Sequence, residues 1–278
     1  MATCATCPHA CDLKPGQLGL CRSRRASDDG SRVLPEGYGR VTSLALDPIE
    51  KKPISCWRAG TTVLSLGSYG CNMRCPFCQN ASIATAAADD VAWREVTPEE
   101  IVSTALDLRG RDCIGIAYTY NEPLVNWEFL RDTGTLAHEA DLVNVLVSNG
   151  MATEPVLLEV APLVDAANID LKCFTDEGYR KLGGDLHAVK RTIEALAASP
   201  ACHLEVTTLV VPGLSDDEEQ VDAMARYLSE LDPHIVYHLT RFFPRHRMSA
   251  ADPTPVRTLH RLREVASNHL ATVLIGNV

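Results

Sequence analysis

Three cysteines in the first half of the chain have the spacing of ligands that converge on one metal centre. Cys71, Cys75 and Cys78 follow a C-x3-C-x2-C pattern within residues 70–80, GCNMRCPFCQN. Cysteine thiolates are the usual protein ligands of iron–sulfur clusters. Because three thiolates cannot saturate the four irons of a [4Fe–4S] cluster, and no fourth cysteine is near in sequence, one iron is left for a chelating ligand. The alternatives are loop cysteines or a zinc site, although a structural zinc normally takes four protein ligands.

The open iron suits a small molecule that carries an amino group beside a carboxylate. S-adenosylmethionine (SAM) has both groups on its methionine part. An electron delivered through the cluster would then break the sulfonium bond and release a 5′-deoxyadenosyl radical. Phe77 directly precedes Cys78, so its ring is expected to pack against the adenine.

The cysteine triplet resembles the motif of the radical SAM superfamily. Residues 47–53, DPIEKKP, together with residues 67–80, resemble the radical SAM component of the AmmeMemoRadiSam group. That group is related to the glycyl-radical-enzyme activases, such as pyruvate formate-lyase activating enzyme. The resemblance extends over nearly the whole chain, from the N-terminal cysteines to residues 276–278. It implies an oxidoreductase that binds a [4Fe–4S] cluster and SAM, and that works under anaerobic conditions.

Polar residues follow two further segments that are expected to be strands. The resemblance implies that Asn121 and Glu122 bind the amino group of SAM, since a carboxylate suits an ammonium ion. The Gly-Gly-Glu form common in the family is replaced here by residues 120–122, YNE. Ser148 and Asn149 end the next strand, where short polar side chains suit hydrogen bonds to a ribose or a carboxylate. Ordinary turns are the alternative for both segments.

Asp170 and Lys172 alternate at the end of another expected strand, which places both side chains on one face. Buried charges are costly unless they are paired or bound to a ligand. The pair resembles the Asp-x-Lys of activases, which implies that Lys172 binds the SAM carboxylate and that Asp170 lies near the substrate. A purely structural ion pair is the alternative.

Later strand ends supply weaker candidates. The segment 207–213 resembles the part of the family fold that lines the adenine, and Val211 is the contact expected there. His238 and Arg241 precede Phe242-Phe243-Pro244, which resembles the substrate-facing end of related activases. Arg241 is therefore predicted to act with Asp170 on the substrate. His238 can equally be a structural residue.

Four more cysteines lie close together at the N-terminus. Cys4, Cys7, Cys11 and Cys21 occupy 18 residues, and Gly16 and Gly19 would permit tight turns between them. Zinc and a second iron–sulfur cluster both fit such a set. Reduced thiols without a metal are the third interpretation.

These residues must be positioned by alternating strands and helices. Apolar content predicts strands at 63–69, 114–120, 143–149, 167–172, 204–211 and 235–240, with a short final strand at 272–276. Helices are expected from the capping boxes at 97–100 and 215–218, at 127–140 and 187–199, and from Pro255 onward. Alternation of this kind predicts parallel βαβ units. The predicted fold is an α/β partial (β/α)6 barrel over 63–278, preceded by a cysteine-rich extension (1–35) and a connector (36–62).

Bulk composition narrows the function further. The chain has 278 residues and a net charge of −10, which disfavours a nucleic-acid-binding surface. No apolar run reaches the ~20 residues of a membrane span, and no signal peptide is apparent, so a cytoplasmic protein is expected. Eleven cysteines in such a chain indicate metal rather than disulfides.

The expected partners follow from this chemistry. The chain needs a reductant such as flavodoxin or ferredoxin, and its substrate is either a protein glycine or a small molecule. A non-catalytic metal scaffold or redox sensor is the alternative to an enzyme.

Overall fold

The computed structural model describes residues 1–278. Its central element is an eight-stranded sheet. Its strand order is β14-β13-β12-β11-β10-β9-β7-β6. The strands are β6 (Ser43–Pro48), β7 (Thr62–Gly67), β9 (Cys113–Tyr118), β10 (Val143–Ser148), β11 (Ala166–Asp170), β12 (His203–Val210), β13 (Val236–Arg241) and β14 (Val273–Gly276). All neighbours pair in parallel except β6, which runs antiparallel to β7. The predicted partial barrel is confirmed.

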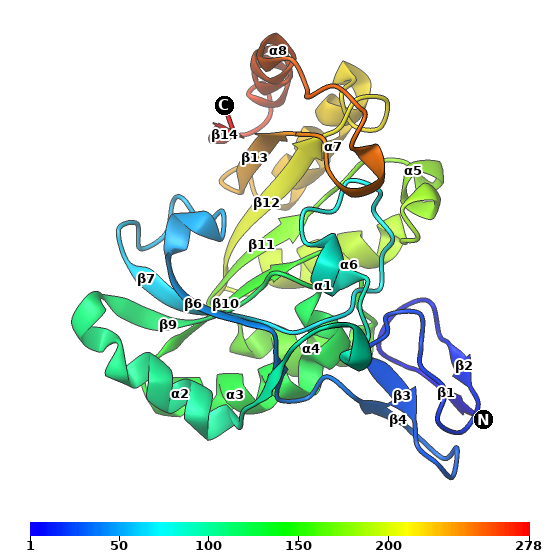
Figure 1. Ribbon diagram of the computed structural model, residues 1–278. Helices are drawn as coiled ribbons and strands as arrows, with labels where there is room; N and C mark the ends of the chain where they lie inside the picture. Colours follow the sequence, from blue (N-terminus) through cyan, green and yellow to red (C-terminus); the bar gives the residue numbers. More distant parts are fainter.

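Helices connect the parallel strands. They are α1 (Ala81–Ala84), α2 (Pro98–Asp107), α3 (Trp127–Glu139), α4 (Glu154–Val160), α5 (Asp176–Lys181), α6 (Leu186–Ala197), α7 (Glu218–Leu231) and α8 (Val256–Ala266). Figure 1 shows α2, α3, α4 and α6 gathered along one side of the curved sheet, with α8 beside β14 at its far end. None of these helices combines the length and the apolar character of a membrane span.

Local sequence explains where the helices begin. Thr97 caps α2 as predicted: its side chain accepts a hydrogen bond from the amide of Glu100, and the Glu100 side chain accepts one from the amide of Thr97. The second predicted capping box is wrong in its position. The cap of α7 is Asp217, whereas Ser215 Oγ binds the preceding turn through the Val211 amide and the Leu209 carbonyl.

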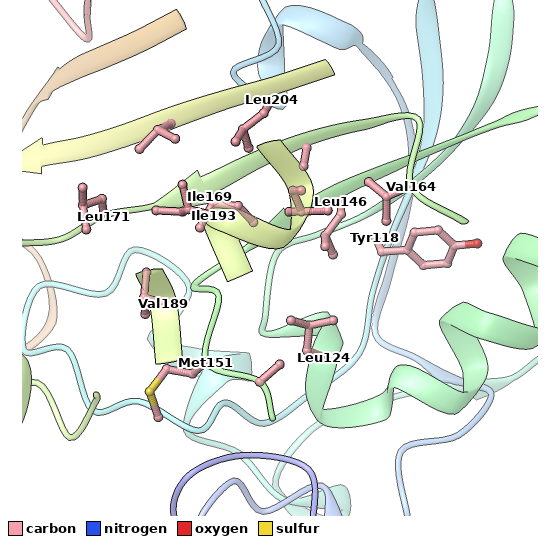
Figure 2. Packing of buried hydrophobic residues seen from close by; sticks show 14 of the residues in the cluster. Tyr118, Leu124, Leu146, Met151, Val164, Ile169, Leu171, Val189, Ile193 and Leu204 are labelled. Carbon is pink, nitrogen blue, oxygen red and sulfur yellow. The ribbon is translucent and has the colours of Figure 1, made fainter. Parts of the chain in front are cut away.

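The main core lies between the sheet and these helices. Figure 2 shows Ile169 of β11 and Leu204 of β12 near Val189 and Ile193 of α6, all of them belonging to one buried cluster. Members of this cluster alternate along the chain at Ala167, Ile169 and Leu171, and they repeat every three or four residues along α6, which is the pattern that packs a helix on a sheet. The strand residues between them are also buried, on the other face of the sheet. The opposite, concave face of the sheet is left for the site.

Residues 36–62, predicted as a connector, form part of the barrel. They supply β6 and a loop that places Ile49 and Ile54 in a small apolar cluster with Val63, Val145 and Ala166. We call residues 49–57 the plug loop. It fills the concave face near the amino ends of several strands.

Short strands build the rest of the chain. They are β1 (Ala2–Thr3), β2 (Asp12–Leu13), β3 (Arg24–Ala26), β4 (Val33–Pro35), β5 (Arg40–Val41) and β8 (Arg94–Glu95). The β1–β2 and β3–β4 hairpins form the N-terminal segment, which Figure 1 shows at one corner of the molecule near α1 and α4. The amide of Thr153, at the start of α4, donates to the carbonyl of Thr6.

Candidate functional site: a cleft at the carboxyl ends of the strands

A cleft of about 490 Å³ opens where the parallel strands end. Loops after β7, β9, β10 and β11 meet at this edge, because parallel strands bring their carboxyl ends together. The predicted site residues that line it are Cys71, Cys75, Phe77, Cys78, Asn121, Glu122, Ser148, Asn149, Asp170 and Lys172. The structure therefore unites residues from four segments that are far apart in sequence.

The cysteine loop directly follows β7. All three of its cysteines line the cleft. The Cys71 sulfur lies 3.4 Å from the amide nitrogen of Met73 and 3.5 Å from Nδ2 of Asn149. Hydrogen-bond donors around cysteine sulfurs are one of the means by which proteins stabilise and tune iron–sulfur clusters. The donor set of three thiols on one loop thus fits a cluster with one open iron.

Glu122 is held as a buried carboxylate at the end of β9. It is 2% exposed, and it accepts hydrogen bonds from Ser148 Oγ at 2.7 Å, the Asn149 amide at 2.8 Å and the Leu124 amide at 2.9 Å. Burial raises the pKa of Glu122 to about 7, although these hydrogen bonds oppose the rise. A buried carboxylate that faces a cleft without a cation beside it fits the binding of an ammonium group.

The side chain of Asn121, next to Glu122, is hydrogen-bonded to the backbone just before the cysteine loop. Its Nδ2 donates to the carbonyls of Tyr69 and Gly70, while its Oδ1 accepts from the amide of Ser68. The side chain therefore ties the end of β9 to the start of the cysteine loop. It lines the cleft, but its polar atoms are already bonded to the chain.

Asp170 and Lys172 lie on the same side of the cleft, as strand alternation predicts. Lys172 Nζ donates to Asp170 Oδ2 at 2.7 Å, and the Lys172 side chain is 14% exposed against 38% for Asp170. Burial disfavours the charge on Lys172, but the nearby Asp170 and Cys75 outweigh burial and raise the pKa of the lysine. Lys172 is therefore a fixed cation within reach of the cysteine loop.

A second polar cluster faces the same cleft, and the sequence argument did not assign it a role. Asp47 accepts hydrogen bonds from Lys51 and Lys52 at 2.8 Å each and from the Tyr120 hydroxyl at 2.6 Å. Burial opposes the charge on Asp47, yet these three donors outweigh it and lower its pKa well below the usual range. The available signal was the run of charged residues at 47–52 in an otherwise apolar stretch.

Tyr120 adopts an unusual backbone conformation to reach Asp47. Its φ is +72°, a region that bulky residues rarely occupy and that costs of order 1–3 kcal/mol. Gly67 makes the conformation fit, because a Cβ there would lie 2.9 Å from the Tyr120 side chain. Strained residues of this kind concentrate at functional sites.

Thr207 supplies a buried, unpaired hydroxyl in the lining. Its Oγ1 is buried and has no hydrogen-bond partner, although the side chain borders the cleft. An orphaned polar atom is expected to meet a ligand group, since leaving it unpaired costs about 1–3 kcal/mol. The buried Glu122 carboxylate, the Lys172 cation and this hydroxyl together fit a zwitterionic nucleoside such as SAM.

Two predicted contacts are not in the cleft. β12 ends at Val210, and the turn that follows carries Val211 into the main core, so that Thr207 and Leu209 line the cleft instead. Arg241 ends β13 on the face opposite Thr240. Its Nε donates to the carbonyl of Thr254 at 2.8 Å, and its guanidinium lies 4.8 Å from the centre of the Phe243 ring.

His238 also lies outside the lining. It shares a hydrogen bond with the buried Glu205, which in turn binds His203 at 2.9 Å. Glu205 further accepts from the amides of Ser55 and Cys56 in the plug loop. His238 therefore takes part in a hydrogen-bond network that fastens the plug loop to β12 and β13.

The N-terminal cysteines lie beside the cysteine loop rather than in the cleft. Cys4, Cys7 and Cys21 are buried, Cys11 is partly exposed, and none forms a disulfide. The carbonyl of Cys21 accepts a hydrogen bond from the amide of Cys71 at 3.1 Å. The extension and the site are therefore one structural unit.

An open parallel barrel with three convergent thiols at its carboxyl edge defines a class of iron–sulfur enzymes. The model of the Radical SAM superfamily matches residues 66–228. The chain belongs to the radical SAM superfamily, whose members use a [4Fe–4S] cluster and SAM.

Individual proteins also match the chain. The uncharacterized protein MJ0808 of Methanocaldococcus jannaschii is 39% identical over 99% of this chain and 81% of its own length. Pyruvate formate-lyase 1-activating enzyme of Escherichia coli is 26% identical over 58% of this chain and 66% of its own length. Among solved structures, QueE from Escherichia coli has a TM-score of 0.56 at 14% identity, and the match covers 86% of this chain and 93% of that one. The last comparison supports the fold alone.

Proposed function

We propose that this enzyme cleaves SAM reductively and uses the resulting radical to abstract hydrogen from a substrate bound in the same cleft. The observation that carries the proposal is that the three thiols, Glu122 and Lys172 line one cleft. When bound, the cluster and SAM supply an electron and a sulfonium bond whose cleavage gives the 5′-deoxyadenosyl radical. The residues of the chain bind and position these groups and the substrate.

The residues of the cleft have separable tasks in this proposal. Glu122 binds the SAM ammonium, and Ser148 and the Asn149 amide keep its carboxylate in place. Lys172 binds the SAM carboxylate, and Phe77 excludes water beside the cysteine loop. Asp170 is more exposed than Lys172, so its second oxygen is free to hold a polar group of the substrate.

A reductant completes the reaction. Cleavage consumes one electron per SAM, and a flavodoxin or a ferredoxin is the donor we propose. The substrate class is either a protein glycine, as in activases, or a small molecule. The absence of any ferredoxin-like insert between Cys78 and the next cysteine, Cys113, favours a substrate outside the two-cluster activases.

Product analysis tests the function. Anaerobically reconstituted protein with dithionite should form 5′-deoxyadenosine and methionine, and the combined variant Cys71→Ala, Cys75→Ala, Cys78→Ala should form neither. If the intact, iron-loaded protein yields no 5′-deoxyadenosine, the chain is a metal scaffold rather than an enzyme. Deuterium transferred into 5′-deoxyadenosine from a labelled protein glycine would assign the activase class, and transfer from a labelled metabolite would assign the other.

Asp170 is tested in the same assay. Asp170→Asn keeps the shape of the side chain but removes its charge. We expect slow 5′-deoxyadenosine formation to persist without substrate, whereas deuterium transfer from the substrate should be lost. Full transfer by Asp170→Asn would remove this residue from the substrate side of the cleft.

A further inference from the structure

Cysteines make up half of the buried apolar residues in the N-terminal segment. Its buried apolar residues, over 1–35, are Ala2, Cys4, Cys7, Leu13, Cys21 and Ala26. Its strands are only two or three residues long. Segments with so little apolar surface to bury usually need a disulfide or a metal, and these cysteines form no disulfide.

The folding of the segment brings the four cysteines together from two hairpins. In the first, the amide of Cys4 donates to the carbonyl of Cys11 at 2.9 Å, so the two face each other across β1 and β2. Cys7 lies in the turn between them. Cys21 lies in the turn before β3, near enough to Cys4 and Cys7 for their charges to interact.

Four thiolates can bind either a zinc ion or an iron–sulfur cluster. The position of the segment favours the cluster, because a redox-active group beside the cysteine loop can act on the potential of the first cluster.

Two connections join the N-terminal cysteines to the cysteine loop. The first is the hydrogen bond from the Cys71 amide to the Cys21 carbonyl. The second passes through Asn72. Its backbone carbonyl oxygen lies 2.8 Å from Nε2 of His9, two residues after Cys7, and its side chain accepts a hydrogen bond from Asn149 Nδ2 at 2.9 Å. Asn149 Nδ2 also contacts the Cys71 sulfur. The path from the N-terminal segment to Cys71 thus contains two buried amide side chains.

We propose that Cys4, Cys7, Cys11 and Cys21 bind a second iron–sulfur cluster, coupled to the first through the Cys21–Cys71 contact and the two amide side chains. The charge of the second cluster acts on the first across this short path, because buried charges are weakly screened. Four thiolates make the second cluster strongly anionic, so its presence makes the first harder to reduce. The second cluster is inferred without reference to SAM, and only the coupling depends on the proposed function.

Iron counting in a variant tests the second site. In Cys71→Ala, Cys75→Ala, Cys78→Ala, prepared anaerobically with iron and sulfide, we expect about half of the wild-type iron to remain, or about four irons per chain. Reduction with dithionite should give an electron paramagnetic resonance signal from this remaining cluster. About one zinc per chain, or a metal-free protein, would overturn the proposal. An iron content equal to that of the wild type would instead show that Cys71, Cys75 and Cys78 hold no cluster. Failure of the second-cluster proposal and failure of the proposed function therefore give different results.

The coupling between the two clusters is tested with a milder variant, because replacing all four N-terminal cysteines can unfold the segment. Cys7→Ser removes one proposed ligand of the second cluster. Cys202→Ser is the matched control, at a partly buried cysteine beside the amino end of β12, opposite the cleft. In a redox titration followed by electron paramagnetic resonance, Cys7→Ser should shift the potential of the first cluster to more positive values, while Cys202→Ser leaves it unchanged. An unshifted potential in a Cys7→Ser protein that has lost the second cluster would refute the coupling.

Discussion

At the scale of single residues, the site is defined by charges that are held in place before any ligand arrives. Glu122 is fixed by three hydrogen bonds and Lys172 by one ion pair. Such preorganised groups need little rearrangement to bind a ligand of the opposite charge. If they bind SAM as proposed, the affinity for SAM should depend on the protonation of Glu122.

Glu122 should make SAM binding depend on pH. Because burial raises its pKa to about 7, the free protein holds mostly the neutral acid below that pH and mostly the carboxylate above it. Binding an ammonium requires the carboxylate, so SAM affinity should fall as the pH drops from about 8 to 6. Equilibrium dialysis with labelled SAM measures this, and Glu122→Gln should abolish the dependence on pH. Glu139→Gln, at the exposed end of α3, is the control and should retain it.

Lys172 should contribute directly to SAM affinity. A charge-assisted hydrogen bond contributes ~1.5–3 kcal/mol, so Lys172→Ala should weaken SAM binding by roughly 10- to 100-fold. Lys181→Ala, on the exposed side of α5, removes a lysine of equal size away from the cleft and should bind SAM as the wild type does. Unchanged affinity in Lys172→Ala would exclude this lysine from the SAM site.

At the scale of elements, the cysteine loop depends on the segment packed behind it. Gly70 has a φ of +84°, and a Cβ at this position would overlap the Cys21 carbonyl oxygen and lie 2.9 Å from Cβ of Ser23. The loop and the N-terminal segment therefore meet at a glycine that no larger residue can replace without displacing one of them.

Two matched variants separate steric overlap from backbone strain. Gly60 has the same φ of +84°, but a Cβ there would have no atom within 4 Å. Gly60→Ala should lower stability by about 1–2 kcal/mol and keep its iron. Gly70→Ala should suffer the same strain and also lose iron, as measured by iron content per folded chain. Equal iron in both variants would show that the contact with Cys21 does not support the loop.

Sequence periodicity was most informative about the elements of the barrel. Patterns local to each segment predicted the parallel strands, the helices α2, α3, α6, α7 and α8, and the convergence of the cysteine triplet with Glu122 and Lys172. They did not predict the short helices α1, α4 and α5. The position of β6 does not, because its place in the sheet is fixed by pairing with β7 and by the apolar contacts of the plug loop. Arg241 lies on the opposite side of β13 from Thr240, which lines the cleft, because side chains alternate along a strand. The substrate contact that the neighbouring motif suggested for Arg241 stays a prediction.

At the scale of the whole molecule, Glu205 connects parts of the fold that are distant in sequence. It binds two histidines from β12 and β13 and two amides from the plug loop, and its side chain is fully buried. Burial opposes its charge, but the hydrogen bonds from His203, His238 and the amides outweigh burial and lower its pKa to about 2.

This network should be visible in the dependence of stability on pH. A carboxylate whose pKa is lowered by folding stabilises the folded state fully above its unfolded pKa of about 4.3, and the contribution is lost as the pH falls toward about 2. Glu205→Gln should therefore lower the free energy of unfolding by roughly 3 kcal/mol at about pH 7 and flatten the acid side of the stability profile. Chemical denaturation of both proteins between about pH 3 and 7 checks this, and parallel profiles would contradict it.

The plug loop also has a kinetic consequence. Lys51, Lys52 and Pro53 of the plug loop line the cleft, and Ile49 and Ile54 of the same loop are buried near the amino ends of the strands, so the plug loop closes this side of the cleft. If SAM and the substrate enter the cleft from the same remaining side, they must bind and leave in a fixed order. The ligand held nearest the cysteine loop has to arrive first, and it stays trapped until the second has departed. Turnover should therefore follow an ordered scheme, with exchange of bound SAM slowed by saturating substrate.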